Sequence, residues 1–283
     1  MPFLPLRDLG IPDPARGFYD AWLQELEHQI TAAGADWNLV TRNVLHGLYF
    51  PGIPDWEEAV NDPRLPAPTR AALLALDPRN VTLEPEYYGD VDPARFARVK
   101  PLLWLWYSFD RAPLAGQNVH LGVRFRRVLA PHVFARCGRN FKCFQFVEFS
   151  YGYNLEVGDD VVVHRHVLLD DRGGLTLGDR VSIADYANIY SHTHSIVDQR
   201  DVTNVRTVLE DDVRITYHAT VLAGVRVGRN GMVGAVAVAT KSVRPYHVNV
   251  GIPAKSVTVK PNAPSDVLAI NLVGGRDPEG GGD

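Results

Sequence analysis

The sequence predicts a mainly β fold: a parallel β-helix preceded by an α-helical N-terminal region. Three observations lead to this prediction. An aliphatic or small residue recurs every six residues through the second half of the chain. Gly or Asp often follows these positions, as the corners between short flat strands require. Residues 1–112 instead space their apolar residues as helices do, with prolines between the segments.

Residues 1–112 are predicted to form the helical region. The expected helices are Phe18–Ala33, Asp36–Tyr49, Thr69–Leu76 and Ala94–Tyr107. We expect this region to cover the open end of the β-helix, because exposed backbone edges invite aggregation. Trp104, Trp106 and Tyr107 either shape an acceptor pocket or belong to the core, which is the usual place for large aromatic residues.

Residues 113–262 are predicted to form the β-helix, with 116–150 as its first, less regular coils. Each coil has three flat sides of about six residues, and one aliphatic side chain per side points inward. Each buried aliphatic residue contributes roughly 1.5–3 kcal/mol. An irregular β-sandwich with coincidental spacing is the alternative. The expected inward residues are Val157, Val163, Leu169, Leu177, Ile183, Ile189, Leu209, Ile215, Val221, Val227, Val233 and Ala239.

Composition limits the possible partners. The net charge is −4, and the chain lacks the basic surface that nucleic-acid binding needs, so we expect no nucleic-acid partner. No apolar run is long enough for an integral membrane segment, and no signal peptide is evident, so we expect a cytoplasmic protein. The two cysteines, Cys137 and Cys143, are expected to be reduced. Residues 263–283 form a tail that we expect to be disordered from about Gly274.

Three segments of the β-helix carry a resemblance to a known family: Ile189–Ser195 (IYSHTHS), Gly234–Lys241 (GAVAVATK) and Gly251–Lys255 (GIPAK). In sequence, order and spacing they resemble hexapeptide-repeat acetyltransferases, which include maltose, galactoside and nodulation-factor O-acetyltransferases. The resemblance covers residues 150–260. It implies a left-handed parallel β-helix, a homotrimer with active sites between neighbouring copies, and acetyl-coenzyme A as the acyl donor.

His194 is the candidate general base. Acyl transfer from a thioester needs a base for the acceptor proton, and histidine suits neutral pH. By resemblance His194 occupies the catalytic Thr-His position of the family, although Ser195 stands where Pro is usual. An ordinary surface histidine is the alternative. His192 is interpreted as contacting the acceptor or orienting the loop, and a structural or solvated histidine is the alternative.

A carboxylate is expected to hold the second ring nitrogen of the base in the right tautomer. Four candidates stay open at this point: Asp170, Asp171, Asp198 and Asp201. We assign His192, Asp170 and Asp198 to acceptor binding.

The later coils are expected to bind coenzyme A. The resemblance implies that Ala235, Thr240 and Lys241 line the slot and that Lys255 approaches the nucleotide phosphates, as a cation should. The small residues Ala223, Gly224 and Gly234 leave room for the pantetheine arm. Tyr217 and Val236 depart from the small residue and the glycine that are usual in the family.

The sequence therefore predicts an acyl-coenzyme A-dependent acyltransferase without a metal, which acetylates a hydroxyl group of a saccharide or related acceptor. One alternative is a zinc-dependent β-helical enzyme like the carbonic anhydrases with this fold, which needs three converging imidazoles. Its candidate ligands would be His164, His166, His192, His194 and His218. Another alternative is a non-catalytic scaffold. The basic segment Arg124–Arg127 is interpreted as a solvated face or an anion-recognising one.

Overall fold

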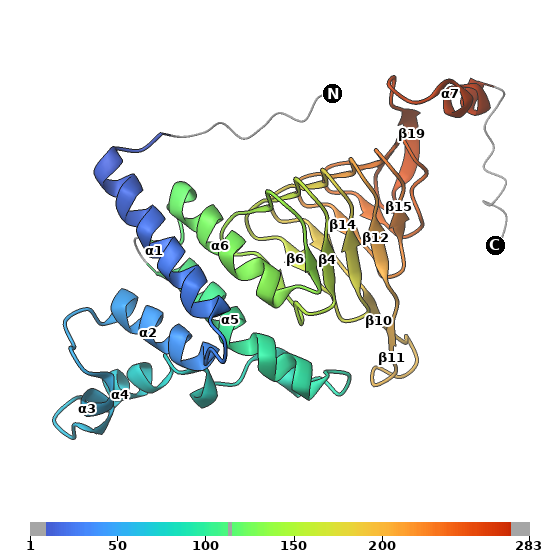
Figure 1. Cartoon of the computed structure of the whole chain (residues 1–283). Helices are drawn as coiled ribbons and strands as arrows, with labels where there is room; N and C mark the ends of the chain where they lie inside the picture. The colour runs from blue at the N-terminus through green and yellow to red at the C-terminus, as the bar shows by residue number, and fades with distance from the viewer. Residues whose placement is uncertain (1–9, 113–114, 273–283) are drawn as a thin grey trace.

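The computed structural model describes residues 10–112 and 115–272 and confirms the predicted fold class. A helical region lies at one end of a parallel β-helix, and the last described elements, β19 and α7, lie at the opposite end (Figure 1). None of the helices in the described ranges is long and apolar enough to cross a bilayer.

The four predicted helices of the N-terminal region are confirmed with small shifts of their ends. Asp36 and Asp92 begin two of them, because each carboxylate accepts hydrogen bonds from backbone N–H groups of the first turn. The short α3 was missed between prolines, although Asp55 caps it in the same way. The elements are α1 (Asp13–Thr31), α2 (Trp37–Tyr49), α3 (Trp56–Asn61), α4 (Ala67–Leu74), the 3-10 turns η1 (Pro78–Asn80) and η2 (Glu84–Tyr87), and α5 (Pro93–Arg111).

A sixth helix, α6 (Val119–Val133), corrects the prediction that residues 116–150 all form coils. Asn118 begins it by accepting a hydrogen bond from the N–H of Leu121. The coils begin only at Arg136. The buried residues of α6 recur at helical spacing and not every six residues. They include Leu121, Phe125, Leu129 and Val133.

Three parallel sheets form the sides of the β-helix, and each coil adds one strand to each sheet. The first sheet consists of β1 (Arg136–Cys137), β4 (Leu155–Val157), β7 (Leu175–Leu177), β12 (Thr207–Leu209) and β15 (Arg226–Val227). The second consists of β2 (Lys142–Cys143), β5 (Val162–Val163), β8 (Ser182–Ile183), β13 (Arg214–Ile215), β16 (Met232–Val233), β18 (His247–Val250) and the antiparallel β19 (Lys255–Val259). The third consists of β3 (Glu148–Phe149), β6 (Leu168–Leu169), β9 (Asn188–Ile189), β14 (Thr220–Val221) and β17 (Val238–Ala239).

The core of the β-helix confirms the six-residue register. Every residue that was expected to point inward is at most 1% exposed. Parallel pairing stacks them in columns; Val163 pairs with Ile183, which pairs with Ile215. A second inward row, two residues earlier in each repeat, was not predicted. It includes Val161, Val167, Val181, Ala187, Val213, Ala219, Val225 and Ala237.

The longer insertion forms a hairpin of β10 (His192–His194) and β11 (Val202–Asn204), which pair antiparallel. It leaves the β-helix between β9 of the third sheet and β12 of the first, and projects beyond the coils in Figure 1. At the C-terminus, α7 (Ser265–Leu272) follows β19. The disorder that we expected from Gly274 lies outside the described residues.

The basic segment Arg124–Arg127 is neither a solvated nor an anion-binding face, which corrects its interpretation. It lies in α6, where the Arg126 guanidinium is buried and bonded to the Asp110 carboxylate. Arg126 Nη1 also donates to the Cys143 carbonyl (3.2 Å), and Arg127 Nε donates to the Phe141 carbonyl (2.9 Å). The helical region therefore covers the open end of the β-helix, as expected.

Two neighbours on β13 test the inward register, because Ile215 is buried and Arg214 is exposed. Ile215→Ala should lower the free energy of unfolding by about 2–5 kcal/mol, since it leaves a cavity in a stacked column. Arg214→Ala should change it by less than about 0.5 kcal/mol. Urea unfolding followed by circular dichroism measures both. Equal losses would contradict the register.

Candidate active site

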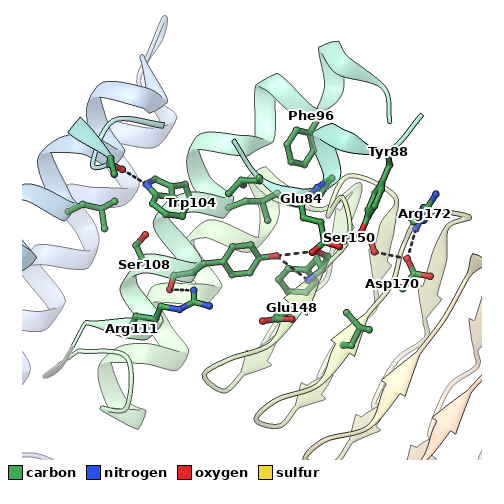
Figure 2. Close-up of a pocket in the computed structure, with 18 of the residues that line it drawn as sticks. Glu84, Tyr88, Phe96, Trp104, Ser108, Arg111, Glu148, Ser150, Asp170 and Arg172 are labelled. Atoms are coloured by element: carbon green, nitrogen blue, oxygen red, sulfur yellow. Dashed lines mark hydrogen bonds between the residues drawn. The ribbon is translucent and has the colours of Figure 1, made fainter. Parts of the chain in front are cut away.

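A cavity of about 770 Å³ lies between the helical region and the third sheet. Figure 2 shows Trp104, Ser108 and Arg111 on its helical side, and Ser150, Asp170 and Arg172 on the side of the coils. His192 lines the polar end of this cavity, whereas His194 is not among its lining residues. The apolar lining includes Leu45, Phe50, Leu76, Leu83, Phe96, Leu103, Trp104, Phe149 and Leu168.

His192 is held by Asp170. Its Nδ1 lies 2.6 Å from Asp170 Oδ2, and the carboxylate is only 2% exposed. Asp170 also accepts from Ser150 Oγ (2.6 Å) and from the backbone N–H of Ser191 (2.9 Å). Because a carboxylate accepts, Nδ1 of His192 donates, and Nε2 of the neutral ring keeps its lone pair. This imidazole can therefore accept a hydrogen bond or a proton from a hydroxyl group in the cavity.

His194 has a different partner. Its Nδ1 lies 2.8 Å from the carbonyl oxygen of Gln199, across the hairpin, and its side chain is exposed. The carbonyl fixes the same tautomer, with the Nε2 lone pair available. The centroids of the His192 and His194 rings are 5.4 Å apart. Two imidazoles of matching tautomer thus lie side by side at the base of the hairpin.

The carboxylate that was expected behind His194 lies behind His192 instead. Asp198 forms an exposed ion pair with Arg200 (2.8 Å). Asp171 is buried and accepts from the N–H groups of Tyr151 (2.7 Å) and Asn154 (2.9 Å). Burial raises the pKa of the Asp171 carboxyl to about 6, against the lowering effect of these backbone hydrogen bonds. Asp171 therefore shapes the corner of the coil and does not orient a histidine.

Asp90 connects the helical region to the coils and the hairpin, a role that the sequence analysis missed. Its carboxylate accepts from Arg172 (2.8 Å), from Asn204 Nδ2 (2.7 Å) and from the Tyr151 hydroxyl (2.8 Å). Burial alone would raise the pKa of Asp90, but these hydrogen bonds outweigh it and lower the pKa below its usual range. The Arg172 guanidinium lies 4.3 Å from the ring centre of Tyr88, which lines the cavity.

The expected coenzyme A residues lie on later coils, at different corners. Ala223, Gly224, Thr240 and Lys241 follow β14 and β17, at the corner from which the hairpin leaves. Gly234 and Ala235 follow β16 at the corner between the second and third sheets, and Lys255 begins β19. Within a single chain, the residues at these two corners therefore do not form one slot. At Gly234, an added Cβ would lie 2.6 Å from Val250, so close packing accounts for this glycine.

Tyr217 and Val236 lie at the corner between the second and third sheets. Tyr217 is half-exposed, with its ring edge against Tyr186 and His218. Val236 has a φ of 61°, in the left-handed region that a β-branched residue rarely adopts. That conformation explains why glycine would be favoured at this position.

The histidines of the zinc alternative do not converge. His166 and His218 stack on the two sides of Tyr186, with centroids 4.8 Å apart in each pair, whereas His192 and His194 lie on the hairpin. Within residues 10–112 and 115–272, no three His, Cys, Asp or Glu side chains gather as a metal site would require.

Comparison with known proteins finds the same fold and related sequences. No model of a known protein family matches the chain. Galactoside O-acetyltransferase of Escherichia coli is 27% identical over 139 residues, which cover 48% of this chain and 68% of that protein. A maltose O-acetyltransferase from Clostridium difficile is similar in structure, with a TM-score of 0.52 and 23% identity, over 61% of this chain and 91% of the other. A hexapeptide-repeat-containing acetyltransferase from Vibrio cholerae, complexed with acetyl-coenzyme A, has a TM-score of 0.52 and 20% identity, over 65% and 98%.

Asp90→Asn tests the connection between the cavity and the hairpin. At neutral pH it should lower the free energy of unfolding by about 1–3 kcal/mol, because the Arg172 guanidinium loses its charged partner. The folded-state pKa of Asp90 lies below the unfolded value of about 3.9, so this contribution is complete well above that pH. It should begin to fall once the pH drops below that unfolded value and be lost fully only below the folded-state pKa, so the difference between wild type and variant should shrink as the pH is lowered.

Urea unfolding at neutral pH and in acid, followed by tryptophan fluorescence, measures the difference. Asp13→Asn is the control, since Asp13 is 90% exposed and its contact with Arg16 is long, at 3.6 Å. If Asp90→Asn lowers the free energy of unfolding equally at neutral and at acidic pH, the stabilising role of the ionised Asp90 carboxylate is contradicted.

Proposed function

We propose that this chain, a relative of the hexapeptide-repeat acetyltransferases, transfers an acetyl group from acetyl-coenzyme A to a hydroxyl group of a saccharide or a related acceptor. The observation that carries the proposal is the pair of imidazoles beside the cavity, each with Nδ1 held by an oxygen acceptor. The likeness to galactoside O-acetyltransferase, whose name states the reaction, supports the type of acceptor.

In the proposed reaction His194 is the general base. Its Nε2 accepts the proton of the acceptor hydroxyl as that oxygen attacks the thioester carbonyl carbon. The carbon–sulfur bond then breaks, and the proton passes to the sulfur of coenzyme A. The carbonyl of Gln199 keeps the imidazole in the required tautomer. His192, whose ring centroid lies 5.4 Å from that of His194, binds the acceptor hydroxyl, and Asp170 takes part by holding the His192 ring. Asp198 contacts the acceptor from the hairpin.

We further propose that the enzyme works as a homotrimer. The coenzyme A residues on two corners of the β-helix become one slot when the corners belong to neighbouring copies. The hairpin loop carries Ile196 and Val197, which are almost fully exposed apolar residues of the kind that subunit contacts bury. Cys137 and Cys143 are free thiols, which suits the reducing cytoplasm.

His194→Ala tests the base. In an assay of thiol release from acetyl-coenzyme A with a panel of sugars, kcat should fall by about 10²–10⁴-fold, the usual contribution of a general base. His28→Ala is the control, because His28 is exposed on α1, far along the chain from the hairpin. Equal activity of wild type and His194→Ala would show that His194 is not the base.

Binding of acetyl-coenzyme A separates an enzyme from a non-catalytic scaffold. At a concentration of 100 Kd the ligand should stabilise the wild type by about 2.7 kcal/mol, which raises its melting temperature. Ala235→Trp should abolish this rise by filling the slot, whereas Ala21→Trp on the exposed face of α1 should keep it. A wild type that acetyl-coenzyme A does not stabilise would favour the scaffold.

A further inference from the structure

We propose that the acceptor carries its reactive hydroxyl on an apolar body, and that this body occupies the cavity between the helical region and the third sheet. The proposal rests on the proposed function only for the reaction at the hydroxyl group. The apolar binding site itself is independent of that chemistry, and the experiment below keeps the two apart.

The helical walls of the cavity expose mainly apolar atoms to a ligand. The polar atoms of their aromatic residues already have partners in the protein. Trp104 Nε1 donates to the Ala75 carbonyl (2.8 Å), and the Tyr49 hydroxyl donates to the Ser108 carbonyl (2.6 Å). The Tyr107 hydroxyl lies 3.2 Å from the carbonyl oxygen of Phe149 and donates to it.

A free sugar would be a poor ligand for this space. Each hydroxyl group that entered it would lose its hydrogen bonds to water and find few replacements among the apolar walls. An alkyl, aryl or polycyclic group would instead gain from leaving water. The volume of about 770 Å³ lies within the range of sites for small organic ligands, about 300–1,000 Å³.

Four polar side chains meet on the coil side of the cavity. They are Ser150, Asp170, Arg172 and His192. Of the other charged residues in the lining, Arg111 donates to the Tyr107 carbonyl (3.2 Å), Glu84 accepts from the Tyr88 hydroxyl, and Glu148 lies on β3. The His192 side chain is 18% exposed, so its imidazole is accessible from the cavity while Asp170 holds its far nitrogen. A ligand with one polar end is thereby oriented, with its hydroxyl beside His192 and next to the ring of His194.

The acceptor fits this cavity better than the acyl chain of a longer donor does. The acceptor hydroxyl needs an imidazole held in a fixed orientation. His192 lines the cavity and is held in this way by Asp170. The residues that we assign to coenzyme A lie on later coils, from β14 onward, whereas the cavity lies at the first coils, against α4 and α5. Donor and acceptor would therefore approach the hairpin from opposite ends of the β-helix.

Octyl β-D-glucoside and methyl β-D-glucoside, which share a polar head, test the proposal by isothermal titration below the micelle-forming concentration. The octyl compound should bind at least about tenfold more tightly, because only its chain adds apolar surface. Ala72→Trp places an indole into the cavity from α4 and should weaken octyl glucoside binding by about tenfold or more. Its neighbour Ala71 is exposed and does not line the cavity, so Ala71→Trp is the matched control and should bind like the wild type.

Each result has one meaning. Equal binding of the two glucosides, or unchanged octyl glucoside binding in Ala72→Trp, overturns the proposal. Decanoyl-coenzyme A is titrated beside acetyl-coenzyme A. If decanoyl-coenzyme A binds more tightly than acetyl-coenzyme A and Ala72→Trp removes that gain, the cavity holds a donor chain, which also overturns it. Octyl glucoside binding without any acetyl-coenzyme A binding supports the apolar site and contradicts the proposed function alone.

Discussion

The unpaired backbone edge of the first coil is the constraint on which the rest of this structure depends. Each later coil bonds to the one before it, but the first has no predecessor. Helix α6 takes that place, and its arginines donate to the carbonyls of Phe141 and Cys143. Buried Arg126 is neutralised by Asp110, whose second oxygen accepts from the N–H of Phe146 (2.7 Å). Breaking this pair would leave a buried charge, which is strongly unfavourable.

Covering the edge also creates the cavity. Asp110 lies on α5, where its carboxylate binds Arg126 of α6 and the N–H of Phe146 in the first coil. These bonds hold α5 in place, and α5 supplies Trp104 and Tyr107 to the cavity wall. The loop after η2 completes the opposite wall, where Asp90 binds Arg172 of the second coil and Asn204 of the hairpin. The element that closes the β-helix is thereby coupled to the hairpin that carries the two histidines.

The geometry of the paired histidines follows from the stacking of coils. Leu169 pairs with Ile189 in adjacent strands, so the residues that follow each of them leave the β-helix one above the other. Asp170 consequently lies beside the backbone of Ser191 and beside the ring of His192. His194 lies two residues further along β10, beyond Asp170, and its Nδ1 is hydrogen-bonded to the Gln199 carbonyl across the hairpin instead.

The sequence alone was sufficient for the β-helix, because its stability comes from a local repeat. The six-residue spacing of Val163, Ile183 and Ile215 predicts that they point inward, and the Gly and Asp residues that follow such positions predict the corners. The sequence also predicted that His192 and His194 lie where a longer insertion interrupts that repeat. The repeat said nothing of α6, whose period is different, or of Asp90, which contacts residues far along the chain. Only the tertiary structure decided that Asp170 serves His192 and that the helices enclose a cavity, because both depend on which surfaces meet when a non-repeating region packs against a repeating one.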